Sequence, residues 1–269
     1  RRARAHAEVN AAAPSAREST RDLAGRASQS ASDHRLVNEK PNPARAAIRV
    51  ISSDRGLAGG YSSNALKQAE ALASLLRSEG KEPVSYLVGR KSVAYYRFRG
   101  RDIENSWTGF SEKPGYADAK EVADTLIDAF VKPTDEGGVD EIHIVYTEYV
   151  SALTQKPVAA RVLPLVVEYT DAPAPDGPLP LYEFEPNPEA LLDALLPRYV
   201  ETRVYAALLA SAASESASRR RAMKAATDNA EDLIKSLTRA ANAARQAEIT
   251  QEISEIVGGA SALASAGSE

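Results

Sequence analysis

A glycine-rich segment is the part of this chain that could most readily bind a phosphate. Gly56, Gly59 and Gly60 follow a β-branched run and precede a helical pattern, and backbone N–H groups in such a turn can bind anions. The segment lacks both the Gly-Lys-Ser/Thr ending of a P-loop and the G-x-G-x-x-G spacing of a dinucleotide site. We therefore interpret the glycines as a tight strand-to-helix turn. An α/β nucleotide-binding enzyme with a helical appendage remains the alternative.

The other residue types that usually carry chemistry form no site in the sequence. His6, His34 and His143 are far apart, without a second ligand or base at motif spacing, and the chain has no cysteine. We expect no catalytic residue, no metal and no cofactor. A net charge of -4 makes nucleic acid a poor partner. No apolar run reaches about 18 residues, so any membrane association should be indirect.

A cluster of basic residues marks a second candidate site. Arg219, Arg220, Arg221 and Lys224 lie within a helical pattern and could bind acidic neighbours at the base of a long helix. A charge run on a helix is more often a solvated face, and that interpretation stays open.

The elements that must position these residues alternate along the middle of the chain. Buried strands are expected at 47–52, 84–88, 141–146 and 158–167, and helices at 62–79 and 116–132, which is the pattern of a parallel, Rossmann-like α/β sheet. A helical segment rich in alanine and arginine (1–40) precedes this domain (45–188), whose end (168–188) is a loop rich in proline. We expect further residues upstream of Arg1.

A very long helix should occupy residues 189–269. From residue 198 to residue 257 there is neither proline nor glycine, and at about 1.5 Å per residue this stretch gives roughly 90 Å of helix. Such a helix exceeds its own domain and needs a partner helix or a surrounding sleeve. Its seam has the alternating four-three spacing of a left-handed coiled coil. The seam consists of Leu209, Ala213, Ser216, Arg220, Met223, Thr227, Ala230, Ile234, Leu237, Ala241 and Ala244.

The phase of that seam breaks near its end. Five residues separate Ala244 from Ile249, after which Ile253 and Ile256 restore the spacing. The apolar face therefore moves around the helix at Arg245 and Gln246, and different surroundings should begin there.

Two stretches resemble the gamma subunit of F-type ATP synthases. The first is SDRGLAGGYSSN at 53–64; the second combines AMKAATDNA at 222–230 with RQAEITQEISEIVGGA at 245–260. The resemblance covers the chain from about residue 45 onward. Ala58 stands where many relatives carry cysteine, and the loop at 168–188 and the alanine and arginine bias are similar to actinobacterial and mycobacterial members.

The resemblance implies a rotor shaft without an active site. Its terminal helices would form an antiparallel coiled coil inside a ring of three alpha and three beta subunits, which hold the catalytic sites. The α/β domain would sit on the membrane c-ring with the epsilon subunit, at the cytoplasmic side of the cell membrane. Proton flow through the c-ring would turn the shaft and drive ATP synthesis. A passive coiled-coil scaffold is a further alternative.

The same resemblance assigns contact residues near the C-terminus. It places the segment after the phase break against the catalytic beta subunits, where polar side chains can bond carboxylates or backbone carbonyls. An apolar group beside them would act as a bearing, because such contacts tolerate sliding better than fixed hydrogen bonds. The polar contacts are Arg245, Gln246, Thr250 and Glu252, and the bearing residues are Ile249, Ile253, Ile256 and Val257. Soluble surface residues and ordinary coiled-coil core are the respective alternatives.

Overall fold

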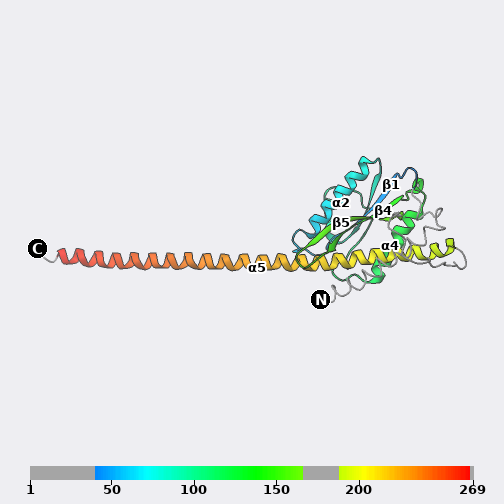
Figure 1. Ribbon diagram of the computed structural model, residues 1–269. Coiled ribbons are helices and arrows are strands. Elements are labelled where there is room, and N and C mark those ends of the chain that lie inside the picture. The colour runs from blue at the N-terminus through cyan, green and yellow to red at the C-terminus, as the bar shows by residue number, and fades with distance from the viewer. Residues whose placement is uncertain (1–39, 166–187, 267–269) are drawn as a thin grey trace, which may run out of the picture. The chain divides into compact units, whose positions relative to one another are not determined.

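The chain contains a five-stranded sheet covered by helices on both faces (Figure 1). A computed structural model describes residues 40–165 and 188–266. The strand order is β3-β2-β1-β4-β5, with β1 to β4 mutually parallel and β5 antiparallel to β4. The strands are β1 (Arg45–Ile51), β2 (Glu82–Val88), β3 (Asn105–Trp107), β4 (Glu141–Tyr149) and β5 (Gln155–Leu163).

Strand β1 lies in the middle of this sheet, and five of its seven side chains are apolar. Six of its seven residues are buried, as expected for a parallel strand covered on both faces. Ala46, Ile48 and Val50 point to one face, and Ala47 and Ile51 to the other.

Two layers of helices bury these faces. Helices α2 (Tyr61–Ser78) and α3 (Arg90–Phe98) cover the first face. Helix α4 (Tyr116–Val131) and the first turns of α5 (Pro188–Ala266) cover the second (Figure 1). A short 3-10 turn, η1 (Thr134–Glu136), precedes β4. No helix in the described part of the chain combines the length and apolarity needed to cross a bilayer.

The predicted fold class, an α/β sheet with a long C-terminal helix, is confirmed. Strand β5, for which no direction was predicted, returns antiparallel beside β4. Helix α3 and strand β3 were not predicted, because both are short. The predicted N-terminal helix up to residue 39 and the loop from 168 to 187 lie outside the described residues, so the coiled coil between the terminal helices stays a prediction.

Helix α5 belongs to two compact units. The first comprises Arg1–Arg221 and the second Ala222–Glu269, so the division falls within the helix. The domain limit of 188/189 stays a prediction. Pro197 lies inside the helix. From Met223 to Ser261 every residue of the second unit is exposed.

One buried side chain in the sheet is costly. Arg49 of β1 is fully buried, and none of its three guanidinium nitrogens has a hydrogen-bond partner among the described residues. Burial lowers its pKa from 12.5 to about 9, because desolvation disfavours the charged form. Arg45, four residues earlier, instead binds Glu82 (Nε to Oε2, 3.0 Å) and the carbonyl oxygen of Gly138 (3.2 Å).

Replacing Arg49 by leucine should stabilise the fold. Removing a buried, unpartnered charge and filling its space with apolar atoms should raise the free energy of unfolding by about 1–4 kcal/mol. Urea unfolding at pH 7 measures this change. Arg45→Leu is the matched variant and should destabilise, since it leaves Glu82 and the Gly138 carbonyl without their donor. A loss of stability in Arg49→Leu as large as that in Arg45→Leu would contradict the assignment.

A second buried charge is fully satisfied and ties two strands together. The Asp140 carboxylate accepts hydrogen bonds from the backbone N–H of Ala44 (2.8 Å) and Arg45 (3.0 Å), from the Thr134 hydroxyl (2.6 Å), and from Lys40. Burial alone would raise its pKa, but the bonds from Lys40, Thr134 and the two amides lower it from 3.8 to about 2. Asp140 thus joins the starts of β1 and β4.

Asp140→Asn should make stability less dependent on pH in the acid range. The folded pKa lies below the unfolded one, so the carboxylate stabilises the fold above pH 4 and loses this effect as the pH falls toward 2. We expect a loss of about 2 kcal/mol at pH 7. Urea unfolding of both proteins at pH 7, 4 and 3 should show the difference shrinking; a constant difference would refute this role.

Candidate functional site

The loop between β1 and α2 is a rigid turn held by one carboxylate. Asp54 accepts hydrogen bonds from the backbone N–H groups of Arg90 (3.1 Å), Gly109 (2.8 Å) and Ser111 (3.0 Å). Its own N–H donates to the Ser111 hydroxyl (2.9 Å). The carboxylate that a metal site would use is therefore bound to three neighbouring backbone groups.

The glycines of this loop allow its sharp course. Gly59 has φ +57, and Leu57, a non-glycine residue, has φ +60, both in the left-handed region. The backbone carbonyls of Arg55 and Gly56 accept hydrogen bonds from Arg219 of α5 (3.3 and 3.2 Å). The loop thus presents oxygen atoms to a cation, which is the opposite of a phosphate cradle.

Helix α5 packs on the sheet through a face whose chemistry changes along its length. Its first part is apolar and belongs to the main core. Farther along, the same face carries serines: the Ser211 hydroxyl accepts from the N–H of Thr147 (3.3 Å), and the Ser214 hydroxyl donates to the Thr147 carbonyl (3.0 Å). Along α5, apolar packing on the sheet therefore gives way to directional hydrogen bonds with β4. The apolar part consists of Leu196, Tyr199, Val200, Val204, Ala207 and Leu208.

The serine face ends at a buried ion pair. Glu215 is fully buried, and its Oε1 accepts from Arg219 Nη2 at 2.7 Å. Burial raises the pKa of Glu215, and the Arg219 guanidinium opposes that rise. Arg219 also pairs with Glu112 (Nη1 to Oε1, 3.1 Å). One guanidinium therefore joins α5, the loop after β1, and Glu112.

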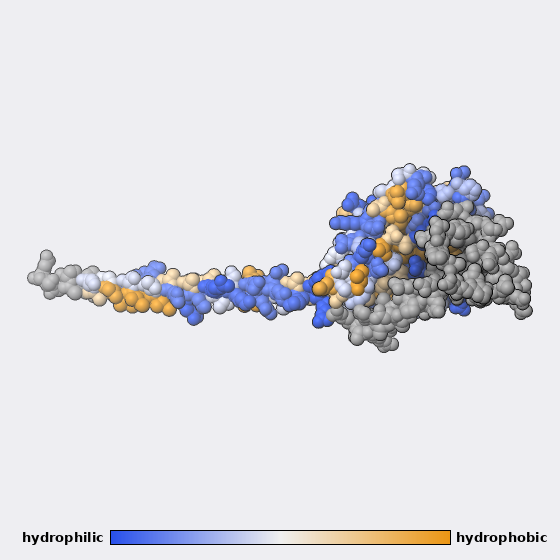
Figure 2. Space-filling view, in the orientation of Figure 1, coloured by the Kyte–Doolittle hydropathy of each residue, from blue (hydrophilic) through white to orange (hydrophobic). Residues whose placement is uncertain are grey.

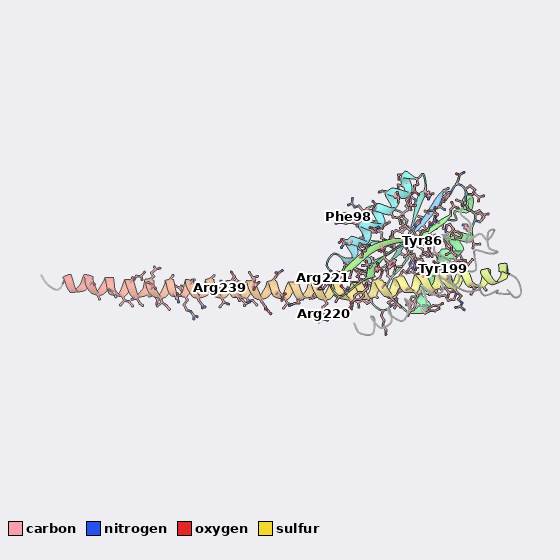
Figure 3. All side chains as sticks on the ribbon, viewed as in Figure 1. Tyr86, Phe98, Tyr199, Arg220, Arg221 and Arg239 are labelled. Atoms are coloured by element: carbon pink, nitrogen blue, oxygen red, sulfur yellow. The ribbon has the colours of Figure 1, made fainter. Side chains whose placement is uncertain are left out.

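The four basic residues of the predicted cluster at 219–224 have two different roles in the structure. Arg221 donates to the Leu153 carbonyl and to Gln155 Oε1 (2.9 Å), so it holds the turn between β4 and β5. Arg220, its exposed neighbour on α5 (Figure 3), has no ion pair within the described residues. Lys224 pairs with Asp228 one turn later (3.1 Å). Arg219 and Arg221 are thus internal contacts, whereas Arg220 and Lys224 remain on the surface.

Helix α5 fills the position at which an open α/β sheet normally binds its ligand. Such ligands lie outside the carboxyl ends of the strands, where the strand order reverses, here between β1 and β4. The hollow at this place is lined by Tyr61, Thr147, Ser218 and Arg221 and holds about 50 Å³. Small-molecule sites usually measure roughly 300–1,000 Å³, so this geometry speaks against a nucleotide there.

The remaining titratable residues of the sheet are structural. His143 Nε2 lies 2.9 Å from Glu141 Oε2, and Lys81 donates to the other oxygen (2.7 Å). His6 and His34 lie outside the described residues. In the described ranges, no group of three or more His, Asp or Glu side chains could hold a metal ion.

The second unit carries the predicted contact residues on an exposed helix. Arg245, Gln246, Thr250 and Glu252 are all exposed, and the Thr250 hydroxyl donates back to the Gln246 carbonyl (2.8 Å). Apolar side chains also gather on this segment (Figure 2). The predicted bearing residues are solvated to 48% for Ile249, 56% for Ile253, 71% for Ile256 and 59% for Val257.

Comparison with known proteins shows to which family this chain belongs. Residues 1–263 match the family model described as ATP synthase. The ATP synthase gamma chain of Parafrankia sp. (strain EAN1pec) is 67% identical over 263 residues, covering 98% of this chain and 88% of that one. The chain belongs to the ATP synthase gamma-chain family.

Other gamma chains agree with this assignment. That of Mycolicibacterium smegmatis is 58% identical over 272 residues, covering 97% of this chain and 88% of its own. The predicted similarity to actinobacterial members is confirmed. Gamma chains are non-catalytic subunits of ATP synthase, so the prediction of a chain without an active site of its own is also confirmed.

Solved structures share the fold at low identity. A chain of the Euglena gracilis mitochondrial ATP synthase (OSCP/F1/c-ring, rotational state 3) has a TM-score of 0.60 at 15% identity, covering 100% of this chain and 94% of that one. A chain of the Tetrahymena thermophila mitochondrial ATP synthase (central stalk/c-ring) has a TM-score of 0.54 at 18% identity, with 84% and 97% covered. These similarities concern the fold.

Several residues of this site were not predicted from the sequence. Asp54 lies within the resembling motif, but its role depends on residues more than thirty positions away. Ser211, Ser214 and Ser218 recur at three- and four-residue spacing on one face of α5, a signal that could have revealed a hydrogen-bonding face. Glu215 could have been recognised as the partner of Arg219 at i,i+4 spacing.

Arg219→Ala should loosen the joint between α5 and the loop after β1. It leaves Glu215 buried without its cation and removes the donor to two loop carbonyls, for a loss of about 2 kcal/mol. Hydrogen exchange of the amides at 54–60 should accelerate, and the midpoint of urea unfolding should fall. Arg220→Ala is the matched control and should change neither. Adding Glu215→Gln to Arg219→Ala should restore part of the stability; no recovery would contradict the ion pair.

Proposed function

We propose that this chain is the central rotor shaft of a proton-translocating F-type ATP synthase. It would couple rotation of the membrane c-ring to conformational change in a ring of three alpha and three beta subunits that make ATP. The epsilon subunit would bind beside its α/β domain. The chain would lie at the cytoplasmic side of the cell membrane and reach the membrane only through the c-ring.

The contrast within helix α5 is the observation that carries this proposal. Up to Arg221 the helix is fixed by apolar packing, by serine hydrogen bonds and by the bonds of Arg219 and Arg221. Beyond Ala222 the part of the chain that the structure describes offers no such anchoring, and Leu233, Ile234 and Leu237 are each about 60% solvated. A helix fixed at one end and exposed at the other is suited to transmit torque into a surrounding partner.

The polar contacts of the shaft would lie after the phase break. Arg245 and Glu252 are exposed and have no ion pair among the described residues, so their charges are available to a partner. Gln246 presents a side-chain amide beside them, and Thr250 would contribute once its hydroxyl leaves the Gln246 carbonyl. These four residues would make transient contacts with the catalytic ring and thereby set coupling and rate.

The apolar residues beside them would form the bearing. Fully burying an isoleucine side chain stabilises by about 1.5–3 kcal/mol, so four exposed aliphatic residues on one short segment favour enclosure by a partner. Nondirectional apolar contact allows one surface to move over another. The bearing would consist of Ile249, Ile253, Ile256 and Val257.

The two alternatives fit the geometry less well. A nucleotide-binding enzyme would need an open switch point, and α5 fills it. A passive coiled-coil scaffold would not need the hydrogen-bonded joint at its base, because a scaffold carries no torque.

Variants of the contact segment test the proposal in the assembled enzyme. The complex is purified through a tag on this chain, then reconstituted into vesicles for assays of ATP hydrolysis and ATP-driven proton pumping. We expect Arg245→Ala and Glu252→Gln to assemble normally but to lower pumping about threefold or more. The reason is that a hydrogen bond to a charged group contributes roughly 1.5–3 kcal/mol.

Arg239→Ala is the matched control, because Arg239 is another exposed arginine of the same helix segment (Figure 3) and precedes the phase break. It should leave pumping unchanged. An equal effect of Arg239→Ala and Arg245→Ala would refute the special role of the contact segment. Failure to recover alpha, beta and c subunits with the tagged chain would refute the rotor itself.

A further inference from the structure

The α/β unit carries a concentrated positive charge that its own fold uses only in part. From Arg90 to Arg101 the chain has five basic residues and no acidic one, although the whole protein has a net charge of -4. This stretch comprises α3 and the turn that follows it. Its helix covers the first face of the sheet, and only its first residues adjoin the loop after β1, where the Arg90 N–H donates to Asp54.

Only part of this charge is satisfied within the fold. Arg101 pairs with Glu70 and lies over the Tyr96 ring (5.7 Å), and Arg99 lies over the Tyr95 ring (5.6 Å). Arg90 and Arg97 are exposed and have no ion pair among the described residues. Two guanidinium groups, with five donors each, are therefore available to a partner.

These two arginines line one groove. They are seven positions apart, two helical turns and roughly 10.5 Å along the helix axis, and therefore lie on the same side of α3. The groove runs between α3 and the end of β3, the edge strand of the sheet, and has a volume of about 340 Å³. Hydroxyls from β3 and small apolar side chains complete it. Its lining is Arg90, Val93, Ala94, Arg97, Ser106 and Thr108.

The composition of this groove favours carboxylates carried on a polypeptide. Guanidinium groups bind carboxylates through paired hydrogen bonds, and serine and threonine hydroxyls can add donors. Val93 and Ala94 offer apolar contact, and Phe98, next to Arg97 at the margin of the unit (Figure 3), is 88% solvated. A lone small anion would use neither apolar surface, and the net negative charge of the chain opposes a long polyanion.

We propose that the groove between α3 and β3 binds an acidic segment of a neighbouring protein subunit, whose carboxylates pair with Arg90 and Arg97 while its backbone covers Val93 and Ala94. The inference rests on the proposed function only in placing the chain within a larger assembly. The groove is lined by residues of α3 and of the end of β3, none of which contributes a side chain to the bonds of Arg219. The groove would thus hold a second subunit to the domain.

Photo-crosslinking in the intact complex tests this docking site. A photoreactive phenylalanine analogue replaces Ala94, which is exposed and lines the groove. After irradiation the crosslinked peptide is identified by mass spectrometry. We expect one dominant product, in a partner segment with several Asp or Glu residues. R90E/R97E should lower its yield about tenfold, since two exposed ion pairs are lost and each is worth up to about fivefold.

Two controls keep the outcomes distinct. The same analogue at Ala71, exposed on α2, should not give this product, and R77E, which reverses an exposed arginine elsewhere on the unit, should leave its yield unchanged. A crosslink to lipid, to a segment without acidic residues, or to no partner at all would overturn the proposal. Complexes are first checked for their subunits, so failed assembly would count against the proposed function and not against the groove.

Discussion

The joint between helix α5 and the sheet is the constraint on which the rest of the structure depends. A single guanidinium, that of Arg219, bonds to Glu215, to Glu112 and to two carbonyls of the loop after β1. The loop itself is held by Asp54, which also fixes the start of α3 and the segment before α4. Two charged side chains thereby connect α2, α3, the segment before α4 and α5 at one edge of the sheet.

This joint also explains why the usual ligand position of an open α/β sheet leaves little room here. Parallel strands bring their carboxyl ends together, and loops there usually leave a crevice for a ligand. Here the serine face of α5 and Arg221 occupy that crevice and leave a hollow of about 50 Å³. The same carboxyl edge that could bind a small molecule instead binds a helix of the same chain. The fold alone therefore does not determine whether the chain binds a ligand.

The sequence predicts the helices and strands that are determined by their own residue pattern. It misses those that form only through contacts with residues distant in the sequence. Strands β1, β2 and β4 and helices α2 and α4 were predicted within a few residues, because their apolar periodicity decides them. Strand β3 has three residues and forms only where β2 can pair with it. Helix α3 is preceded by Gly89, where a Cβ atom would lie 2.3 Å from the Ser52 carbonyl oxygen. No local sequence pattern reveals this requirement for glycine.

The antiparallel direction of β5 had a usable signal. Only residues 150–154 connect β4 with β5, and a parallel return needs a crossover of a dozen or more residues. For the candidate site, the predicted contact residues at 245–257 are exposed as a contact segment requires, while Arg219 and Arg221 bind within their own unit. Sequence spacing cannot distinguish an arginine that serves a partner from one that holds its own fold.

The serine face has a consequence for how the helix can move on the sheet. Alanine and leucine contacts are nearly interchangeable when a helix rolls about its axis by a fraction of a turn, so apolar packing alone defines the roll angle weakly. The bonds of Ser211 and Ser214 to the two backbone groups of Thr147 exist at only one roll angle. Replacing Ser211 and Ser214 by alanine would keep the face buried but would remove the bonds that fix the roll angle. The two serines therefore limit how far the helix can rotate about its axis on the sheet, more than they add to the free energy of unfolding.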